Sequence, residues 1–186
     1  MKNPAKNFTL IIFALAFFST GSALANKPVD DIKVPFGIRN YDIGSAQNFT
    51  LSDIDGEKFE LEDNRGQWVF LHFWASWCGP CREEMPTLQT LADALQDESF
   101  QIVMVNTAED EDTIFEFLAA IDVELNSLMD DDGLVTEAWK PRGLPTTFLI
   151  NPVGEVKYQA IGGREWSKPE YIGFLKKLIS SSDKKR

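Results

Sequence analysis

Two cysteines, Cys78 and Cys81, are the only ones in this chain of 186 residues. A disulfide between them would close a very short loop, and a cross-link restricts the unfolded chain more when its loop is long. Such a pair suits dithiol–disulfide exchange, in which a thiolate attacks a disulfide sulfur, better than it suits stabilisation. We therefore expect a redox-active Cys78–Cys81 disulfide and no further cofactor.

Zinc sites also use a Cys-x-x-Cys pair, but a structural zinc site has four ligands as a rule. Beyond its two cysteines the chain has a single histidine, His72. The sequence therefore favours redox chemistry over metal binding, and we expect no metal site.

The cysteines stand between a predicted buried strand and a predicted helix. Residues 68–73 are nearly all apolar and rich in aromatic side chains, which is typical of a strand covered on both faces. After the cysteines, apolar residues recur at spacings of three and four as far as about residue 96, which predicts a helix. Cys78 would then lie at the helix N-terminus, where unpaired N–H groups and the helix dipole stabilise a thiolate.

This placement gives the residues of the motif different roles. Cys78 is the expected nucleophile, and Cys81 lies one turn further along the same face, where it can resolve a mixed disulfide. Pro80 is tolerated because the amide hydrogens of a first helical turn lack partners. Trp77 can shield the site from water and offer a flat apolar contact surface.

The rest of the chain alternates strands with helices. A β-hairpin is predicted around residues 55–56. Further strands are predicted at residues 100–105, 147–150 and 156–160. Helices are predicted at residues 113–121 and 169–179, with a short helix between them that ends near residue 139. This order predicts an α/β fold with a mixed central sheet, helices on both faces and an N-terminal β-hairpin extension.

The first 25 residues have the layout of a secretory signal peptide. Lys2 and Lys6 precede the apolar run of residues 8–18, and residues 23–25 form an A-x-A cleavage pattern. A retained membrane anchor is the alternative, although a spanning helix needs about 20 apolar residues. We expect a periplasmic protein, or one anchored in the membrane and facing the periplasm. Residues 26–48 are predicted to be an extended lead-in, and residues 49–186 the domain.

The charge balance is acidic, with 29 Asp and Glu residues against 18 Lys and Arg residues. Because like charges repel, unspecific binding to nucleic acid or anionic lipid is not expected. Nucleic acid is therefore not among the expected partners.

Two segments resemble known signatures. FWASWCGPCREEMP, residues 73–86, is similar to the active-site segment of the thioredoxin superfamily. GLPTTFLINPVG, residues 143–154, resembles its second signature, most closely in the exported TlpA/ResA-like branch. The resemblance covers roughly residues 49–180 and implies the thioredoxin fold. It also implies a cis bond between Leu144 and Pro145, in a loop that lies beside the cysteines and pairs with bound substrate. The competing interpretation is that Pro145 merely ends a loop.

Glu84 and His72 are the expected supporting residues. The resemblance implies that an acidic residue at position 84 influences thiol acidity and proton transfer, whereas the alternative is a charge that merely suits the start of a helix. His72 stands where cytosolic thioredoxins carry a buried Asp. It is interpreted first as a hydrogen-bonded core residue and second as a proton shuttle. Arg82 is expected to be an exposed, salt-bridging residue; the alternative is that Arg82, four residues after Cys78, stabilises the Cys78 thiolate.

The dipeptide Gly79-Pro80 is the one found in reducing thioredoxins. The resemblance therefore implies a reductase for disulfides of exported client proteins, with cytochrome c maturation as one pathway and a membrane electron donor that recycles the dithiol. The alternatives are a thiol oxidase or isomerase of the same fold, a thioredoxin-like peroxidase, and a copper-delivery protein. A pure interaction domain is a further alternative, which the presence of both cysteines disfavours.

Overall fold

The computed structural model describes residues 32–121 and 123–183. The predicted signal segment, residues 1–25, lies outside the described residues. Within the described part of the chain, no helix is both long and apolar enough to cross a membrane.

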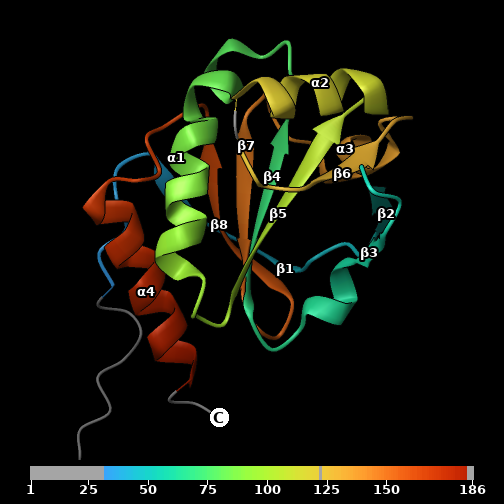
Figure 1. The fold of residues 1–186 in the computed structure, drawn as a ribbon. Coiled ribbons are helices and arrows are strands. Elements are labelled where there is room, and N and C mark those ends of the chain that lie inside the picture. Colours follow the sequence, from blue (N-terminus) through green and yellow to red (C-terminus); the bar gives the residue numbers. More distant parts are fainter. Residues whose placement is uncertain (1–31, 122, 184–186) are drawn as a thin grey trace, which may run out of the picture.

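The described residues form one mixed sheet of eight strands in the order β1–β8–β7–β4–β5–β6–β2–β3 (Figure 1). The strand β4 lies inside the sheet, where it pairs parallel to β5 and antiparallel to β7. The strands are β1 (Ile38–Ser45), β2 (Thr50–Asp53), β3 (Lys58–Glu60), β4 (Trp68–Trp74), β5 (Phe100–Thr107), β6 (Ser127–Asp130), β7 (Thr146–Ile150) and β8 (Glu155–Ile161).

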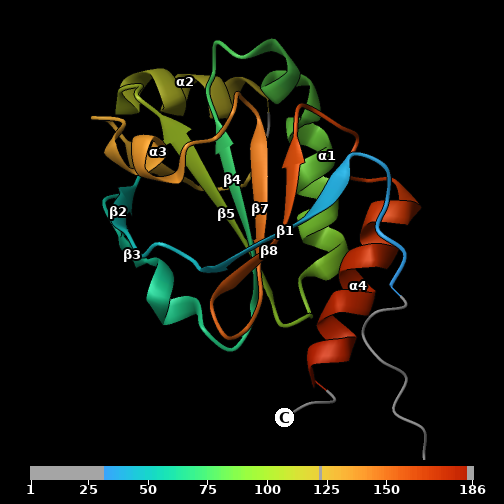
Figure 2. The same ribbon diagram turned by 180° about the vertical axis from the view of Figure 1, so that it is seen from behind.

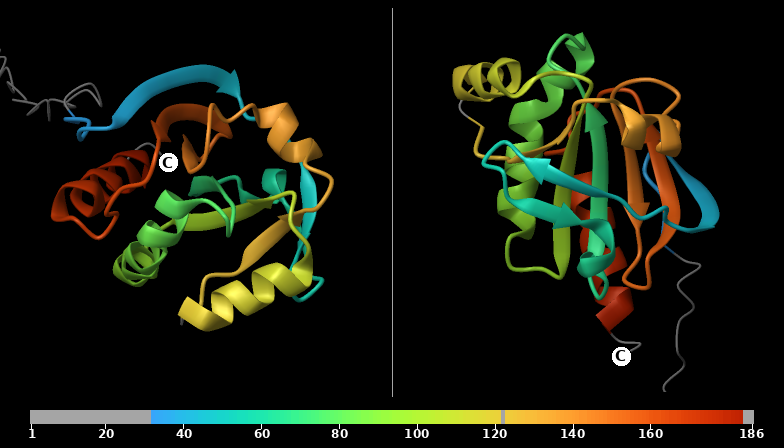
Figure 3. Two further views of the ribbon diagram at one scale, coloured as in Figure 1. Left: turned by 90° about the horizontal axis from the view of Figure 1, so that it is seen from above. Right: turned by 90° about the vertical axis from the view of Figure 1, so that its right-hand side faces the viewer.

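Helices cover both faces of this sheet, as the sequence predicts. The helices α1 (Gly79–Leu95), α2 (Glu111–Ile121) and α4 (Pro169–Asp183) pack on one face, and the short α3 (Leu134–Trp139) packs on the other. Figure 2 shows the face that carries α3, and Figure 3 shows the layers from above and from the side.

The burial of β4 explains its sequence. All seven of its residues are buried, because its alternate side chains enter two different cores. Phe70 and Trp74 pack beneath α1 and α4, whereas Leu71 and Phe73 pack on the side of α3. A strand covered on both faces has no polar face, which is why residues 68–73 lack the alternation of a surface strand.

The predicted hairpin is present as the antiparallel pair β2–β3, and β2 joins it to the sheet through β6. The strand β1 differs from the predicted lead-in of residues 26–48, because residues 38–45 pair with β8 and belong to the sheet. Only Ile38 of this edge strand is buried, so its sequence shows no periodic apolar pattern. The sheet therefore begins about ten residues before the expected domain boundary at residue 49.

Candidate redox site

The two cysteines form a disulfide at the point where α1 begins. Cys78 is the N-cap residue of α1, with extended backbone angles, and its sulfur accepts a hydrogen bond from the amide of Cys81 at 3.3 Å. Cys78 is 6% exposed and Cys81 is fully buried. The helix N-terminus stabilises negative charge on Cys78, and the difference in exposure leaves Cys78 as the sulfur that a partner can approach.

Trp77, directly before Cys78, is 69% exposed. An exposed aromatic ring leaves a flat apolar surface open to solvent beside the sulfur. The contact and shielding roles predicted for Trp77 stay predictions.

The loop that carries Trp77 is held by Glu109, a residue that no sequence motif singles out. The Glu109 carboxylate accepts a hydrogen bond from the amide of Ser76 at 2.7 Å and another from the Ser76 hydroxyl. It also accepts one from the buried Asn106 side chain at 2.7 Å. Glu109 opens the acidic run of residues 109–112, which leads into the first turn of α2. Negative charge suits a helix N-terminus, so the sequence gives no signal of this contact.

Arg82 differs from the expectation of a salt-bridging residue. Among the described residues it has no ion pair; its guanidinium lies 5.2 Å from the centre of the Phe117 ring and donates to the Ser76 carbonyl at 3.5 Å. Because Arg82 projects from α1 toward α2, this aromatic face takes the place of the expected carboxylate partner.

His72 and Glu84 lie together in the interior, on opposite elements. His72 on β4 is 0% exposed and Glu84 on α1 is 2% exposed. The Nε2 atom of His72 lies 3.2 Å from Oε1 of Glu84, and Nδ1 lies 2.9 Å from the hydroxyl of Thr147. The prediction that His72 is hydrogen-bonded in the core is confirmed, but the sequence nominates His72 and Glu84 separately and does not predict that they meet.

The second oxygen of Glu84 is held by the loop between β8 and α4. Its Oε2 accepts hydrogen bonds from the amide of Arg164 at 3.0 Å and from the indole of Trp166 at 3.2 Å. Trp166 is itself buried and packs edge-on against Phe70. Neither Arg164 nor Trp166 is predicted from the sequence, since they stand 80 and 82 positions from Glu84 and outside both recognised motifs.

The same loop touches the first turn of α1. A Cβ atom placed on Gly163 would lie 2.9 Å from the carbonyl oxygen of Pro80, so only glycine fits at this position. An open hollow of about 410 Å³ lies beside this contact and reaches Glu84; it is lined by Pro80, Glu83, Glu84, Thr87, Gly163, Arg164 and Glu165. The site therefore has a solvent-facing side next to the buried carboxylate.

The peptide bond between Leu144 and Pro145 is cis, as expected. Thr146 pairs with Phe73 near the end of β4, and the loop from β4 to Cys78 begins two residues later. The cis bond thus lies at the same end of the sheet as the cysteines. The Pro145 carbonyl accepts a hydrogen bond from the amide of Gly162 at 2.8 Å. Pairing of this loop with bound substrate stays a prediction.

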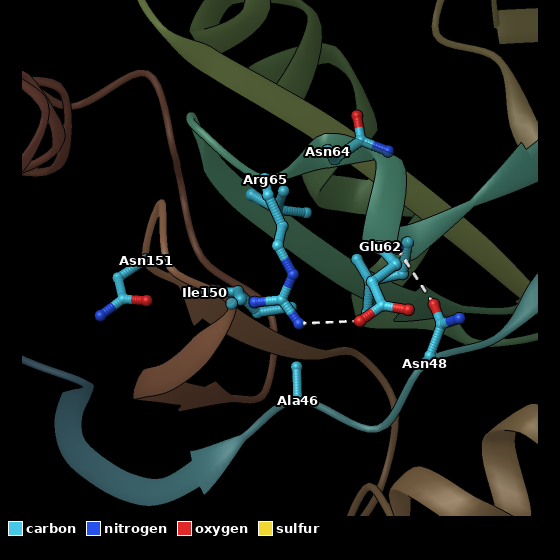
Figure 4. A pocket seen from close by; sticks show the side chains of 10 residues that line it. Ala46, Asn48, Glu62, Asn64, Arg65, Ile150 and Asn151 are labelled. Carbon is cyan, nitrogen blue, oxygen red and sulfur yellow. Dashed lines mark hydrogen bonds and ion pairs between the residues drawn. The ribbon is translucent and has the colours of Figure 1, made fainter.

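A second hollow lies at the opposite end of β4, between the turn after β7 and the segment that precedes β4 (Figure 4). In Figure 4 Arg65 reaches toward Glu62, and their nitrogen and oxygen atoms are 3.1 Å apart. The volume of this hollow is about 20 Å³, which has room for about one water molecule. This hollow is too small for a substrate and lies away from the cysteines.

Known proteins are similar to this chain over the part that carries the cysteines. The model of the AhpC/TSA family matches residues 44–159. The thiol-disulfide oxidoreductase ResA of Bacillus subtilis (strain 168) is 39% identical over 111 residues, which cover 60% of this chain and 62% of that relative, somewhat less than two thirds of its length. A thiol-disulfide oxidoreductase ResA of Bacillus cereus is 33% identical over 133 residues, which cover 72% of this chain and 76% of the relative. The crystal structure of StoA from Bacillus subtilis superposes with a TM-score of 0.60 at 29% identity, covering 68% of this chain and 96% of that one.

Proposed function

This chain belongs to the AhpC/TSA family and is a thioredoxin-like thiol-disulfide oxidoreductase, and we propose that it reduces disulfides in exported proteins. The observation that carries the proposal is the unequal pair of sulfurs at the start of α1, with Cys78 slightly exposed and Cys81 buried behind it.

The reaction follows from this arrangement. In the reduced protein the Cys78 thiolate attacks a client disulfide, and a mixed disulfide forms while one client sulfur leaves as a thiolate. Cys81 then loses its proton and attacks Cys78, which closes the Cys78–Cys81 bond and releases the second client sulfur. Two electrons and two protons pass to the client in total.

The contact surface for the client is formed around Cys78. Trp77 offers an exposed ring on one side, and the cis Leu144–Pro145 loop lies at the same end of the sheet. We propose that the extended client segment lies between them and that the backbone of this loop pairs with it. Gly79 and Pro80 keep the first turn of α1 free of bulky side chains next to the sulfurs.

The proposal also covers the direction of electron flow and the compartment in which the protein works. The signal-like residues 1–25 favour a periplasmic location, cleaved or anchored, where disulfides form and persist. A reductase in such a compartment needs an outside supply of electrons, so a membrane electron donor would recycle the dithiol. Maturation of cytochrome c is a pathway that would need such a reductase, because its client cysteines must be thiols when they react.

Trapping tests the proposal. Cys81→Ser leaves Cys78 unable to release a client, so the expected result is a stable mixed disulfide with one or a few exported proteins, dissolved by dithiothreitol. Cys78→Ser is the matched control and should trap none. Equal trapping by both variants would contradict the assigned roles. Efficient oxidation of reduced proteins without reduction of insulin disulfides would favour the oxidase alternative.

A further inference from the structure

The helix α2 leaves one large aromatic side chain in solvent. Phe115 is 63% exposed, whereas its neighbours Ile114 and Phe117 are buried. Because each residue turns a helix by about 100°, Phe115 and Phe117 point to nearly opposite sides of α2. Phe117 lies against Trp74 in the core, with the ring centres 5.5 Å apart. Phe115 therefore lies outside the apolar stripe that packs α2 on the sheet.

An open hollow of about 450 Å³ lies beside Phe115. Its walls are α2, the segment that follows α2, and the turn between β2 and β3; a hydrogen bond from the Asn126 side chain to the Asp53 carboxylate joins the last two. Its apolar lining consists of Ile54, Phe115, Leu118, Ala119, Val123 and Leu125. Single exposed apolar residues are common on protein surfaces, but apolar side chains from three segments gathered in one hollow are typical of an interaction site.

The segments around this hollow carry acidic side chains and no basic ones. Residues 53–57 include three Asp and Glu residues and residues 112–126 include four, and neither segment has a Lys, Arg or His. Among the residues that the structure describes, none of these carboxylates is in an ion pair. Lys58, which follows the turn, lines a separate hollow, and Arg82 approaches α2 from the side of α1, over Phe117. The uncompensated negative charge attracts cationic groups.

This charge restricts what can cover the hollow. A second copy of the chain that met this face with its own would bring like charges together, and an anionic lipid surface would be repelled as well. A protein segment with apolar side chains between Lys or Arg residues would bury the apolar groups on Phe115 and place the cations near Glu116 and Glu124. The complementarity therefore selects a basic amphipathic segment.

The hollow belongs to the end of the molecule that carries the sulfurs. The strands β4 and β5 are parallel, so the loop to Cys78 and the loop to α2 leave the sheet at the same end, and Figure 1 shows α2 across that end. Glu109 joins the two loops through its hydrogen bonds to Ser76. Phe115 is four residues after Glu111, the first residue of α2, which is about 6 Å along the helix axis. A client bound at Cys78 can therefore reach the hollow with a segment that lies near its cysteines in sequence.

We infer that the hollow beside Phe115 is a second docking site for the exported client, and that it takes a basic amphipathic segment near the client's cysteines. This inference rests on the proposed function, because it names the class of client that Cys78 serves. Docking at the hollow raises the effective concentration of the client disulfide at Cys78 without any new contact to the reacting sulfurs. The half-saturating client concentration should therefore fall while the limiting rate stays the same.

Binding can be measured apart from the redox reaction. The probe is a synthetic peptide of about 14 residues without cysteine, built from Leu and Lys so that Leu lies on one helical face, added to the ¹⁵N-labelled full chain. We expect amide shifts at α2, at residues 123–126 and at the β2–β3 turn, and weaker binding when salt rises from about 0.05 M to about 0.5 M. A peptide with Glu in place of Lys should cause no shifts. Equal shifts with both peptides, or shifts at other places only, would overturn the inference, as would shifts at α2 on concentrating the protein alone, which would assign the hollow to a second copy.

Two substitutions separate the apolar part of the docking site from its charge. Phe115→Ser should weaken binding of the basic peptide about tenfold, and Glu116→Lys about threefold. Both side chains are exposed, so the fold should be retained. The matched controls are Val153→Ser, at a side chain that is 64% exposed in the turn after β7, and Glu98→Lys, at an exposed residue before β5; both should leave binding unchanged. An equal loss of binding in a variant and its control would contradict the assigned site.

The kinetics connect the hollow with the sulfurs. Two peptides share the same disulfide ring, and one of them continues through a Gly/Ser linker of about ten residues into the basic amphipathic segment. With pre-reduced full chain and no other reductant, the extended peptide should half-saturate the rate at a concentration about tenfold lower, at the same limiting rate. Phe115→Ser should remove this difference, and a difference that persists there, or none in the wild type, would overturn the inference. Failure of the proposed function looks different, because the wild type would then reduce neither peptide while the cysteine-free peptide still binds.

Discussion

The two ends of β4 carry polar side chains in opposite settings. At the end where the cysteines lie, His72 and Glu84 are buried and face each other, and Glu109 holds the loop before Cys78. At the other end, Arg65 pairs with Glu62 in a partly exposed contact beside the small hollow of Figure 4. Water can replace partners at the second end, but it cannot reach the contact between His72 and Glu84 at the first. Substitutions at the two ends should therefore differ in kind as well as in size.

The largest effect is expected at the sulfurs. Cys78→Ser should abolish reduction of insulin disulfides, because no nucleophile remains, and Cys81→Ser should abolish turnover while it still forms adducts at Cys78. Turnover measured with dithiothreitol as electron source checks this. Residual turnover of Cys78→Ser within about tenfold of the wild type would contradict the assignment of Cys78 as the nucleophile.

The second-largest effect is expected for Glu109, whose carboxylate holds the loop before Cys78. Glu109→Ala leaves Ser76 and Asn106 without their acceptor, so we expect a loss of about 2 kcal/mol in the free energy of unfolding. The loop before Cys78 should also lose its fixed position, which we expect to lower kcat/KM for insulin reduction about tenfold. Urea unfolding and steady-state rates measure the two effects. Glu111→Ala, in the same acidic run, is the control and should change neither; equal behaviour of the two variants would show that Glu109 does not brace the loop.

A smaller effect is expected at the opposite end. Arg65→Ala removes a partly exposed ion pair and a contact to the Val153 carbonyl, which together should contribute about 1 kcal/mol or less to stability. Disulfide reduction should be unchanged, because the hollow there serves no step of the reaction. A fall in kcat/KM at unchanged stability would show that the two ends are coupled.

The smallest effect concerns the pH dependence of stability at the edge of the sheet. Hydrogen bonding to Lys157 lowers the pKa of Asp42 and the pKa of Glu155. The contact with Asp42 joins β8 to β1, whereas Glu155 and Lys157 both lie on β8. A lowered folded-state pKa contributes stability above the ordinary carboxyl range, and this contribution is lost as the pH falls through the folded values. Lys157→Met should flatten the decline of the urea midpoint between about pH 5 and pH 3. An unchanged slope would show that these exposed pairs contribute nothing.

The centre of the fold could be predicted from the sequence because its signals are local. The apolar run of β4 and the three-and-four spacing of α1 specify the elements on either side of Cys78, and the second motif locates the cis proline. The edge strand β1 has no such signal, since most of its side chains are exposed.

The contacts around the site could not be predicted in the same way. Glu84 meets Arg164 and Trp166 across about eighty positions of sequence, and His72 meets Glu84 only because α1 packs on the face of β4 that carries His72. These meetings depend on tertiary packing. Residue type and spacing could predict His72 and Glu84 each as a supporting residue, but they could not predict that the two side chains lie in contact.

The reduction potential of the Cys78–Cys81 couple tests the proposed reductase function most directly. Equilibration of the purified protein with dithiothreitol buffers, with the fraction of free thiols counted by alkylation and mass, gives this value. We predict a potential near that of thioredoxin, about −270 mV, because a client disulfide must be reduced. A value near that of a strong oxidant such as DsbA, about −120 mV, would contradict the reductase direction and assign the same site to thiol oxidation.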